Sequence, residues 1–178
     1  MAVGLALPHN RRSGAITFTE TWNGQGWTYA PAPLATAYAA GLSCPAASHC
    51  VAVGTGAQQA GIGQLLDGAH WAQPAMPWPS GTQSSLYGVS CAAKTCLAVG
   101  AAGPSQAPDT SSRPAALARN GATWTWLAIP GGTSGILYGV TCVTAADCVA
   151  VGRARDGNAT RNLAEFWNGT TWTISNPA

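Results

Sequence analysis

Charged side chains are scarce in this chain of 178 residues. Asp, Glu, Lys and Arg make up 8% of the sequence, against about a quarter in ordinary globular proteins. Lysine occurs once, at Lys94, and the arginines are scattered, so no basic stripe predicts nucleic-acid binding. Long apolar runs are also missing. All fall far short of the roughly 20 residues that a membrane helix needs, so no membrane span is predicted.

What the chain does contain is a repeat, marked by three short motifs in fixed order. The first motif is Gly-x-Ser/Thr-Cys, at Gly41–Cys44, Gly88–Cys91 and Gly139–Cys142. The second is Cys-x-Ala-Val-Gly, at Cys50–Gly54, Cys96–Gly100 and Cys148–Gly152. The third is a turn closed by tryptophan, at Trp22–Trp27, Leu66–Trp71, Arg119–Trp124 and Trp167–Trp172. The second cysteines recur after 46 and 52 residues, which is close to the length of a propeller blade.

Each motif is typical of a β-strand or of a tight turn between strands. The two cysteine motifs are short, apolar and β-prone, and they predict a buried hairpin. Residues such as Ala115–Ala118 form a third strand, and Asn-Gly or Asp-Gly then gives the strongest short signal for a hairpin turn. The closing tryptophan begins a fourth strand, such as Trp124–Leu127. The sequence therefore predicts an all-β fold, a β-propeller-like array of four-stranded antiparallel blades.

The first unit of the array is predicted to be incomplete. Met1–Gly4 aligns with Val51–Gly54, which follow the inner strand and the cysteine hairpin in the second unit. The first unit is therefore expected to lack that inner strand and that hairpin. We expect three full blades and one partial blade, hence 15 strands, in a single repeat domain with units of about 1–34, 35–80, 81–130 and 131–178. A truncated product, an internal start and a fragment of a longer propeller all fit. The unpaired strand at Met1–Gly4 predicts a possible homo-oligomer through this blade.

The six cysteines lie in three close pairs, which could be metal ligands or disulfides. Zinc ligands commonly sit two to four residues apart with other Cys or His residues completing the set, but the gaps here are longer and no His accompanies each pair. We therefore predict no metal site and three local disulfides, each closing one hairpin. Disulfides indicate an oxidising setting, secreted or cell-surface, although the N-terminus carries no recognisable signal peptide. The predicted pairs are Cys44 with Cys50, Cys91 with Cys96, and Cys142 with Cys148.

The Asn/Asp-Gly-x-x-Trp turn resembles the Asp-box hairpin of sialidase-like propellers. In that family the hairpin joins the third and fourth strands of a blade and is structural. Asp67 alone keeps the aspartate, and the usual Ser or Thr before it is absent. The whole unit is similar to tandem paired-cysteine repeats of secreted actinobacterial proteins, which implies an extracytoplasmic repeat protein. The three arginines, the Tyr/Glu pair and the acidic Asp of sialidases cannot be placed here, so the resemblance does not imply that activity.

The eight tryptophans divide into two groups by their place in the repeat. Trp27, Trp71, Trp124 and Trp172 occupy one repeat position, so we predict that they pack between blades. The other four vary between copies and are the candidates for an exposed ligand-binding surface. These candidates are Trp22, Trp78, Trp126 and Trp167.

Catalytic groups are few. The sequence has neither a Gly-x-Ser-x-Gly elbow nor a His-Glu-x-x-His motif. His9, His49 and His70 lie in different parts of the repeat, so we expect surface or turn residues and no catalytic triad. Glu20 and Glu165 are equivalent by repeat, which favours a structural hydrogen bond over a catalytic pair. We predict no catalytic residue and no cofactor. The favoured function is a non-catalytic, extracytoplasmic module that binds a glycan or a protein; the alternatives are a carbohydrate-active hydrolase or lyase, and a structural fragment of a larger propeller.

Overall fold

The computed structural model describes residues 1–6, 16–31, 38–68, 70–104, 111–130, 134–157 and 159–175. These residues form 15 strands and one short 3-10 turn, η1 (Ala57–Gln59), and the strands pair into four antiparallel sheets. The predicted all-β fold, with three four-stranded blades and one three-stranded blade, is confirmed. Among the described residues, no helix is long and apolar enough to cross a membrane.

The sheets follow the order of the chain, and we number the blades accordingly. Blade 1 contains β1 (Ala2–Ala6), β2 (Ile16–Trp22) and β3 (Trp27–Pro31). Blade 2 contains β4 (Tyr38–Ala46), β5 (His49–Thr55), β6 (Gly61–Asp67) and β7 (His70–Ala72). Blade 3 contains β8 (Thr82–Ala92), β9 (Thr95–Pro104), β10 (Arg113–Asn120) and β11 (Thr123–Leu127). Blade 4 contains β12 (Ser134–Thr144), β13 (Asp147–Asp156), β14 (Ala159–Trp167) and β15 (Trp172–Ser175).

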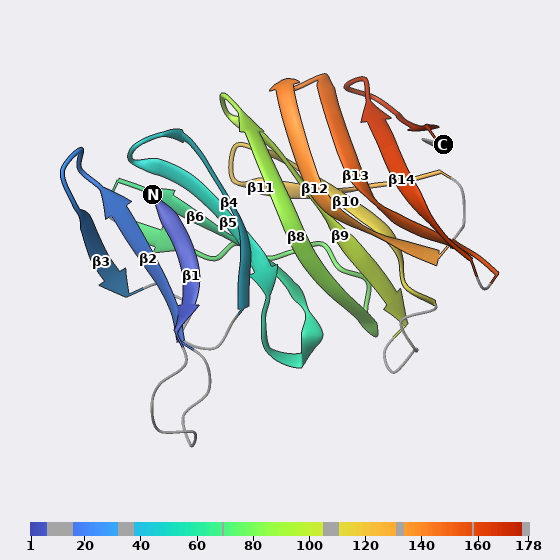
Figure 1. Cartoon of the computed structure of the whole chain (residues 1–178), viewed down its shortest axis with the longest axis horizontal. Coiled ribbons are helices and arrows are strands. Elements are labelled where there is room, and N and C mark those ends of the chain that lie inside the picture. The colour runs from blue at the N-terminus through green and yellow to red at the C-terminus, as the bar shows by residue number, and fades with distance from the viewer. Residues whose placement is uncertain are drawn as a thin grey trace.

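The four blades stand side by side, with blade 1 and blade 4 at opposite ends of the array (Figure 1). The inner strands β4, β8 and β12 pack against one another in turn, and β1 packs against β4. Each inner blade therefore has an N-side face, turned to the preceding blade, and a C-side face, turned to the following one. In the described residues, the N-side face of blade 1 and the C-side face of blade 4 have no blade against them.

The cysteine hairpins have the geometry that the motifs predict. Disulfides join Cys44 to Cys50, Cys91 to Cys96 and Cys142 to Cys148, which confirms the predicted pairing. In each hairpin the inner strand carries a β-bulge opposite the glycine that ends Cys-x-Ala-Val-Gly. A Cβ at these glycines would overlap a carbonyl oxygen of the bulged strand. The overlapping pairs are Gly54 with Tyr38, Gly100 with Ser85, and Gly152 with Ile136.

The hairpin turns form at the predicted positions. Their glycines have positive φ: Gly24, Gly68, Gly121 and Gly169. The Asn or Asp before each glycine does not, so the expected type I′ geometry, which needs positive φ at both central residues, is not formed. In blades 1 and 4 the asparagine side chain closes the turn. The Oδ1 of Asn168 accepts hydrogen bonds from the backbone N–H groups of Thr170 and Thr171, at 2.9 and 2.8 Å.

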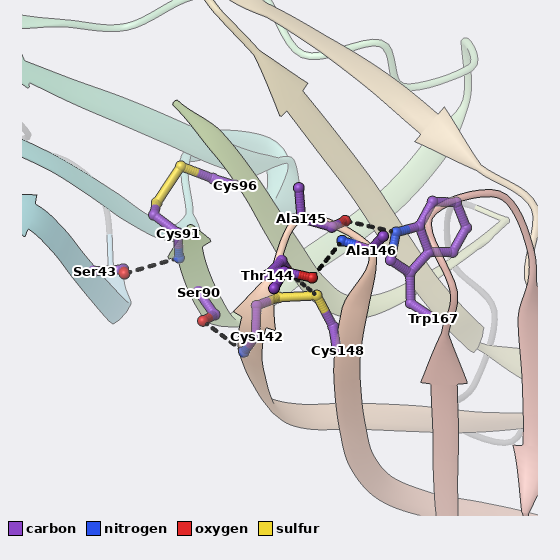
Figure 2. The surroundings of a disulfide bond; sticks show 10 residues. All are labelled: Ser43, Ser90, Cys91, Cys96, Cys142, Thr144, Ala145, Ala146, Cys148 and Trp167. Carbon is purple, nitrogen blue, oxygen red and sulfur yellow. Dashed lines mark hydrogen bonds between the residues drawn. A yellow bond between two sulfur atoms is a disulfide. The ribbon is translucent and has the colours of Figure 1, made fainter. Parts of the chain in front are cut away.

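The core lies between blades rather than within one sheet. Val51 and Val53 on the C-side face of blade 2 cluster with Leu117 and Trp124 from blade 3. Leu97 and Val99 of blade 3 cluster in the same way with residues of blade 4, including Trp167 and Trp172. Serine hydroxyls add a polar contact across the joints between blades 2 and 3 and between blades 3 and 4 (Figure 2): Ser43 Oγ accepts from the Cys91 N–H, and Ser90 Oγ from the Cys142 N–H, both at 3.0 Å.

Candidate functional site

A cavity of about 670 Å³ opens between blades 2 and 3 at the rim where the cysteine hairpins end. In blade 2, the register pairs His49 at the start of β5 with Asp67 at the end of β6. This pairing brings the tip of the cysteine hairpin and the Asp-Gly turn to the same rim. The corresponding tip and turn of blade 3 form the opposite wall. A volume of this size lies within the range of small-molecule and peptide-side-chain pockets.

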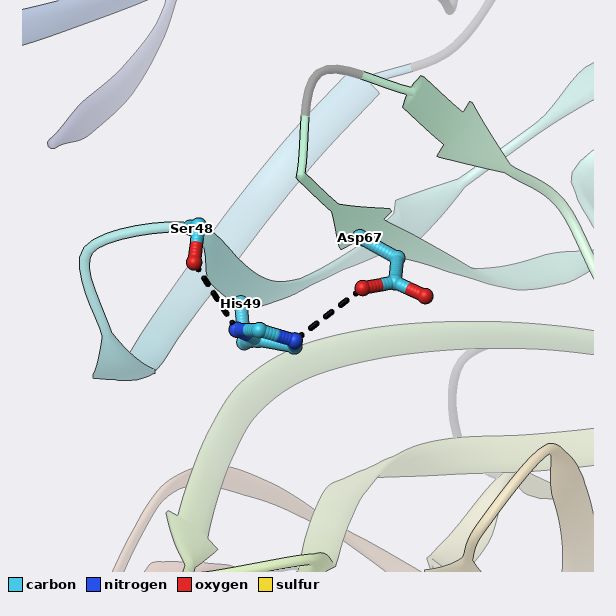
Figure 3. A network of polar contacts seen from close by, with 3 residues as sticks. All are labelled: Ser48, His49 and Asp67. Carbon is cyan, nitrogen blue, oxygen red and sulfur yellow. Dashed lines mark hydrogen bonds and ion pairs between the residues drawn. The ribbon is translucent and has the colours of Figure 1, made fainter.

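The wall from blade 2 combines an apolar floor with a polar edge. Val51 and Leu65 lie on the floor, beside the disulfide-bonded Cys50. At the edge, Ser48, His49 and Asp67 form a connected network (Figure 3). His49 Nε2 lies 3.0 Å from Asp67 Oδ1, and His49 Nδ1 lies 3.0 Å from Ser48 Oγ. The network links the hairpin tip to the Asp-Gly turn at this edge of the cavity.

The Ser48–His49–Asp67 network joins the residue types of a hydrolase triad, which the sequence did not predict. In a working triad the aspartate is buried, so that it holds and charges the imidazole in a medium of low polarity. Here the His49 and Asp67 side chains are 59% and 85% exposed. Water screens such a pair, which is typical of a surface ion pair with little energetic weight. The geometry therefore favours a structural role for this network.

The wall from blade 3 is cationic. Ala93, Gly121 and Ala122 leave room in front of it, and Lys94 and Arg119 carry its charge. Arg119 is half-buried, and its Nε is a buried donor without a hydrogen-bond partner. Its Nη1 donates to the disulfide sulfur of Cys96, at 3.8 Å. Burial lowers the pKa of Arg119, but a guanidinium stays protonated in proteins. Among the described residues, no carboxylate forms an ion pair with this cation.

The equivalent position of the next joint shows why the cavity is large. Trp167 of blade 4 occupies the repeat position of Arg119, and its indole N–H donates to the Ala145 carbonyl at 3.2 Å (Figure 2). The indole fills much of the rim between blades 3 and 4, where a cavity of only about 300 Å³ is left. The joint with arginine at this position has the larger cavity, and the joint with tryptophan has the smaller one.

The predicted ligand-binding tryptophans do not form one surface. Trp22 is exposed on blade 1, and its ring lies against Trp27. Trp78 and Trp126 form an edge-to-face pair, with the Trp78 indole N–H donating to the Gly61 carbonyl. Trp167 was expected on the surface, and this placement is wrong, because its side chain is buried against blade 3. None of the four is among the residues that line the larger cavity.

The tryptophans that were predicted to pack between blades differ in burial from blade to blade. Trp124 and Trp172 are buried in the joints, as expected. Trp27 is exposed, because no described blade covers the N-side face of blade 1. Sequence reasoning missed Lys94 and Arg119. The available signal was the single charged residue, Arg119, at a repeat position that otherwise holds Trp22, Leu66 and Trp167.

Glu165 lies in the joint between blades 3 and 4, away from the larger cavity. Its side chain is fully buried and its Oε2 has no hydrogen-bond partner, so the predicted structural hydrogen bond is not made at this oxygen. Burial raises the pKa of Glu165 to about 7. Among the described residues, no group of three or more His, Cys, Asp or Glu side chains could hold a metal ion.

Comparison with known proteins supports the fold and goes no further. No protein-family model matches the sequence, and no curated protein matches it. A solved structure described as "YCF48 bound to D1 peptide" is similar, with a TM-score of 0.50 and 12% sequence identity over 79% of this chain. This chain spans 55% of that protein's length. At this identity the likeness shows the β-propeller fold alone, and it supports neither the Asp-box family nor the actinobacterial repeats.

Proposed function

We propose that this chain is a non-catalytic binding module and that its ligand is a peptide segment of a partner protein, held in the cavity between blades 2 and 3. The observation that carries the proposal is the Arg119 guanidinium, half-buried at the wall with its Nε unpaired. A carboxylate matches the planar fork of a guanidinium, and Lys94 on the same wall adds a second positive charge. An acidic side chain would therefore offset the cost of the unpaired charge.

The floor of the cavity defines the rest of the ligand. Val51, Leu65 and Ala72 offer an apolar surface next to the cations. An aliphatic or aromatic side chain adjacent to the acidic one would cover this surface and exclude water from the ion pair. The disulfide-closed hairpins on both walls support a preformed site, which limits the ordering cost of binding. The three disulfides also fit an extracytoplasmic setting, and we propose secretion or display at the cell surface.

A glycan is the second candidate ligand. Sugars stack on the exposed faces of Trp, Tyr and Phe, and none of these three residue types is among the described residues that line the cavity. The exposed pair Trp22 and Trp27 on blade 1 is the place where a glycan would bind. The two ligand classes therefore predict different sites. A hydrolase or lyase activity has less support, because the Ser48–His49–Asp67 network lies in water.

The experiment is to probe the purified chain with an array of random heptapeptides and with a glycan array. Peptides that carry Asp or Glu beside an apolar residue should bind. Binding should weaken about tenfold or more, or about 1.4 kcal/mol, in Lys94→Glu and in Arg119→Leu. Leu66 occupies the position of Arg119 in blade 2, so leucine is compatible with the blade.

The matched control is Arg113→Glu, a charge reversal at an exposed arginine at the start of β10, outside the cavity lining. It should leave peptide binding unchanged, and thermal melts should show that all variants fold. The proposal fails if no peptide binds, if binders lack an acidic residue, or if Lys94→Glu binds like the parent. Glycan binding that is lost in Trp22→Ala would support the second candidate instead.

A further inference from the structure

Two apolar faces stand at the ends of the described array. The C-side face of blade 4 exposes Val151 and Phe166. The N-side face of blade 1 exposes Trp22, Trp27 and Tyr29. The rings of Trp22 and Trp27 form a tilted pair, and the ring of Tyr29 stacks on that of Phe18. Clusters of large apolar side chains on one face of a sheet mark an interaction surface more often than scattered single residues do.

The repeat shows what these side chains do when a neighbouring blade is present. Val53 and Val99, on the C-side faces of blades 2 and 3, are 2% and 0% exposed, whereas Val151 at the same repeat position is 51% exposed. Trp172, on the N-side face of blade 4, is 4% exposed, whereas Trp27 at the same position is 55% exposed. The exposed residues therefore belong to faces that this fold buries elsewhere.

The way in which the faces meet is also visible within the chain. Val99, on a C-side face, lies in one core cluster with Trp167 and Trp172, on an N-side face. The motif that supplies those two tryptophans recurs in blade 1 as Trp22 and Trp27. The C-side face of blade 4 therefore corresponds to one side of the joint between blades 3 and 4, and the N-side face of blade 1 corresponds to the other side. Each of the two faces could serve as the partner of the other.

We propose that copies of this chain associate head to tail, with the N-side face of blade 1 of one copy packed on the C-side face of blade 4 of the next. Trp22 and Trp27 would then cover Val151 as Trp167 and Trp172 cover Val99.

Charge favours a second copy over an arbitrary apolar partner. The β13 side chains Arg153 and Arg155 are exposed and alternate along the strand with Val151, so they share the C-side face of blade 4. Glu20 shares the N-side face of blade 1 with Trp22. Asp147 is exposed on the same face of β13, so the C-side face carries two positive charges and one negative charge. The joint between copies therefore sets a face of net positive charge against a face that carries Glu20. This contact uses the faces of the sheets and is distinct from pairing at the open edge of β1.

The proposed joint is heterologous, because it uses two different surfaces. Such joints give a ring if the rotation closes and a filament if it does not. Light scattering coupled to size exclusion should show that the parent chain grows in mass with concentration. Val151→Glu blocks the C-side face and Trp27→Glu blocks the N-side face, and each variant alone should be monomeric.

The decisive measurement is an equimolar mixture of these two variants. Each still carries one intact face, so the mixture should form a dimer and nothing larger. Both substitutions lie at exposed positions, and thermal melts should show that the monomers stay folded. Gln58→Glu, an exposed change in η1 away from both faces, should assemble like the parent. A parent chain that stays monomeric, or a mixture that does not form a dimer, would overturn the proposal.

Discussion

The hydroxyl oxygen of Ser90 in blade 3 accepts a hydrogen bond of 3.0 Å from the backbone N–H of Cys142 in blade 4. Ser43 and Cys91 make the same contact between blades 2 and 3, also at 3.0 Å. The Gly-x-Ser/Thr-Cys motif therefore links blades as well as strands. Its serine connects successive cysteine hairpins at the rim where the cavities lie.

Ser90→Ala should lower the free energy of unfolding by about 1 kcal/mol or somewhat more, because the partly buried Cys142 N–H would lose its acceptor. The matched control is Thr141→Ala. Thr141 holds the same repeat position in blade 4, where no described blade follows, so its change should stay within about 0.5 kcal/mol. Urea unfolding of both variants gives the comparison. Equal losses would contradict a link between blades.

The inner-strand glycines offer a second matched pair. A Cβ at Gly88 would lie 3.0 Å from the Cα of Gly139 and 3.1 Å from the Tyr138 carbonyl oxygen, and backbone atoms cannot move aside cheaply. Gly88→Ala should therefore cost about 1–3 kcal/mol. At Gly139 the nearest atom is Val151 Cγ2 at 3.8 Å, which is an ordinary contact.

Gly139→Ala should accordingly be neutral or stabilise slightly, since alanine reduces the freedom of the unfolded chain. Thermal melts should separate the two variants by several degrees, at about 2–4 °C for each kcal/mol in a chain of this size. If Gly139→Ala destabilises as much as Gly88→Ala, the packing of β8 against β12 is not what sets the cost.

Much of the fold could be predicted from the sequence because every structural element leaves a local mark. The cysteine motifs mark the hairpins, Asn-Gly and Asp-Gly mark the turns, and the repeat gives the number of blades. Burial is harder to predict, since it depends on the neighbouring blade. Trp22 and Trp167 begin the same six-residue turn motif, yet one is exposed and the other is buried.

The cavity could not be predicted for a related reason. Arg119 is visible in the sequence as an exception to its repeat position, but the space in front of it comes from small residues on two blades, including Ala72 and Ala122. Which residues face each other across a joint follows from the stagger between sheets. That stagger is a tertiary property, and no local motif encodes it.

Glu165 predicts a pH dependence of stability. It lies at the repeat position of Gln64 and Leu117, which are also buried. Burial raises its pKa from 4.5 to about 7, so between these pH values the folded chain keeps a proton that the unfolded chain has released. The favourable contribution of the protonated carboxyl is present below pH 4.5 and is lost as the pH rises toward about 7.

Glu165→Gln tests this directly, because Gln64 shows that a glutamine fits the same position of a joint. Near pH 4 the variant and the parent should melt at similar temperatures, since the parent carboxyl is then neutral in both states. At pH 8 the parent holds a buried carboxylate, and the variant should melt several degrees higher. Asp147→Asn, which removes an exposed carboxylate, should show no comparable gain. A difference between Glu165→Gln and parent that stays constant from acid to neutral pH would mean that Glu165 is solvated in the folded chain.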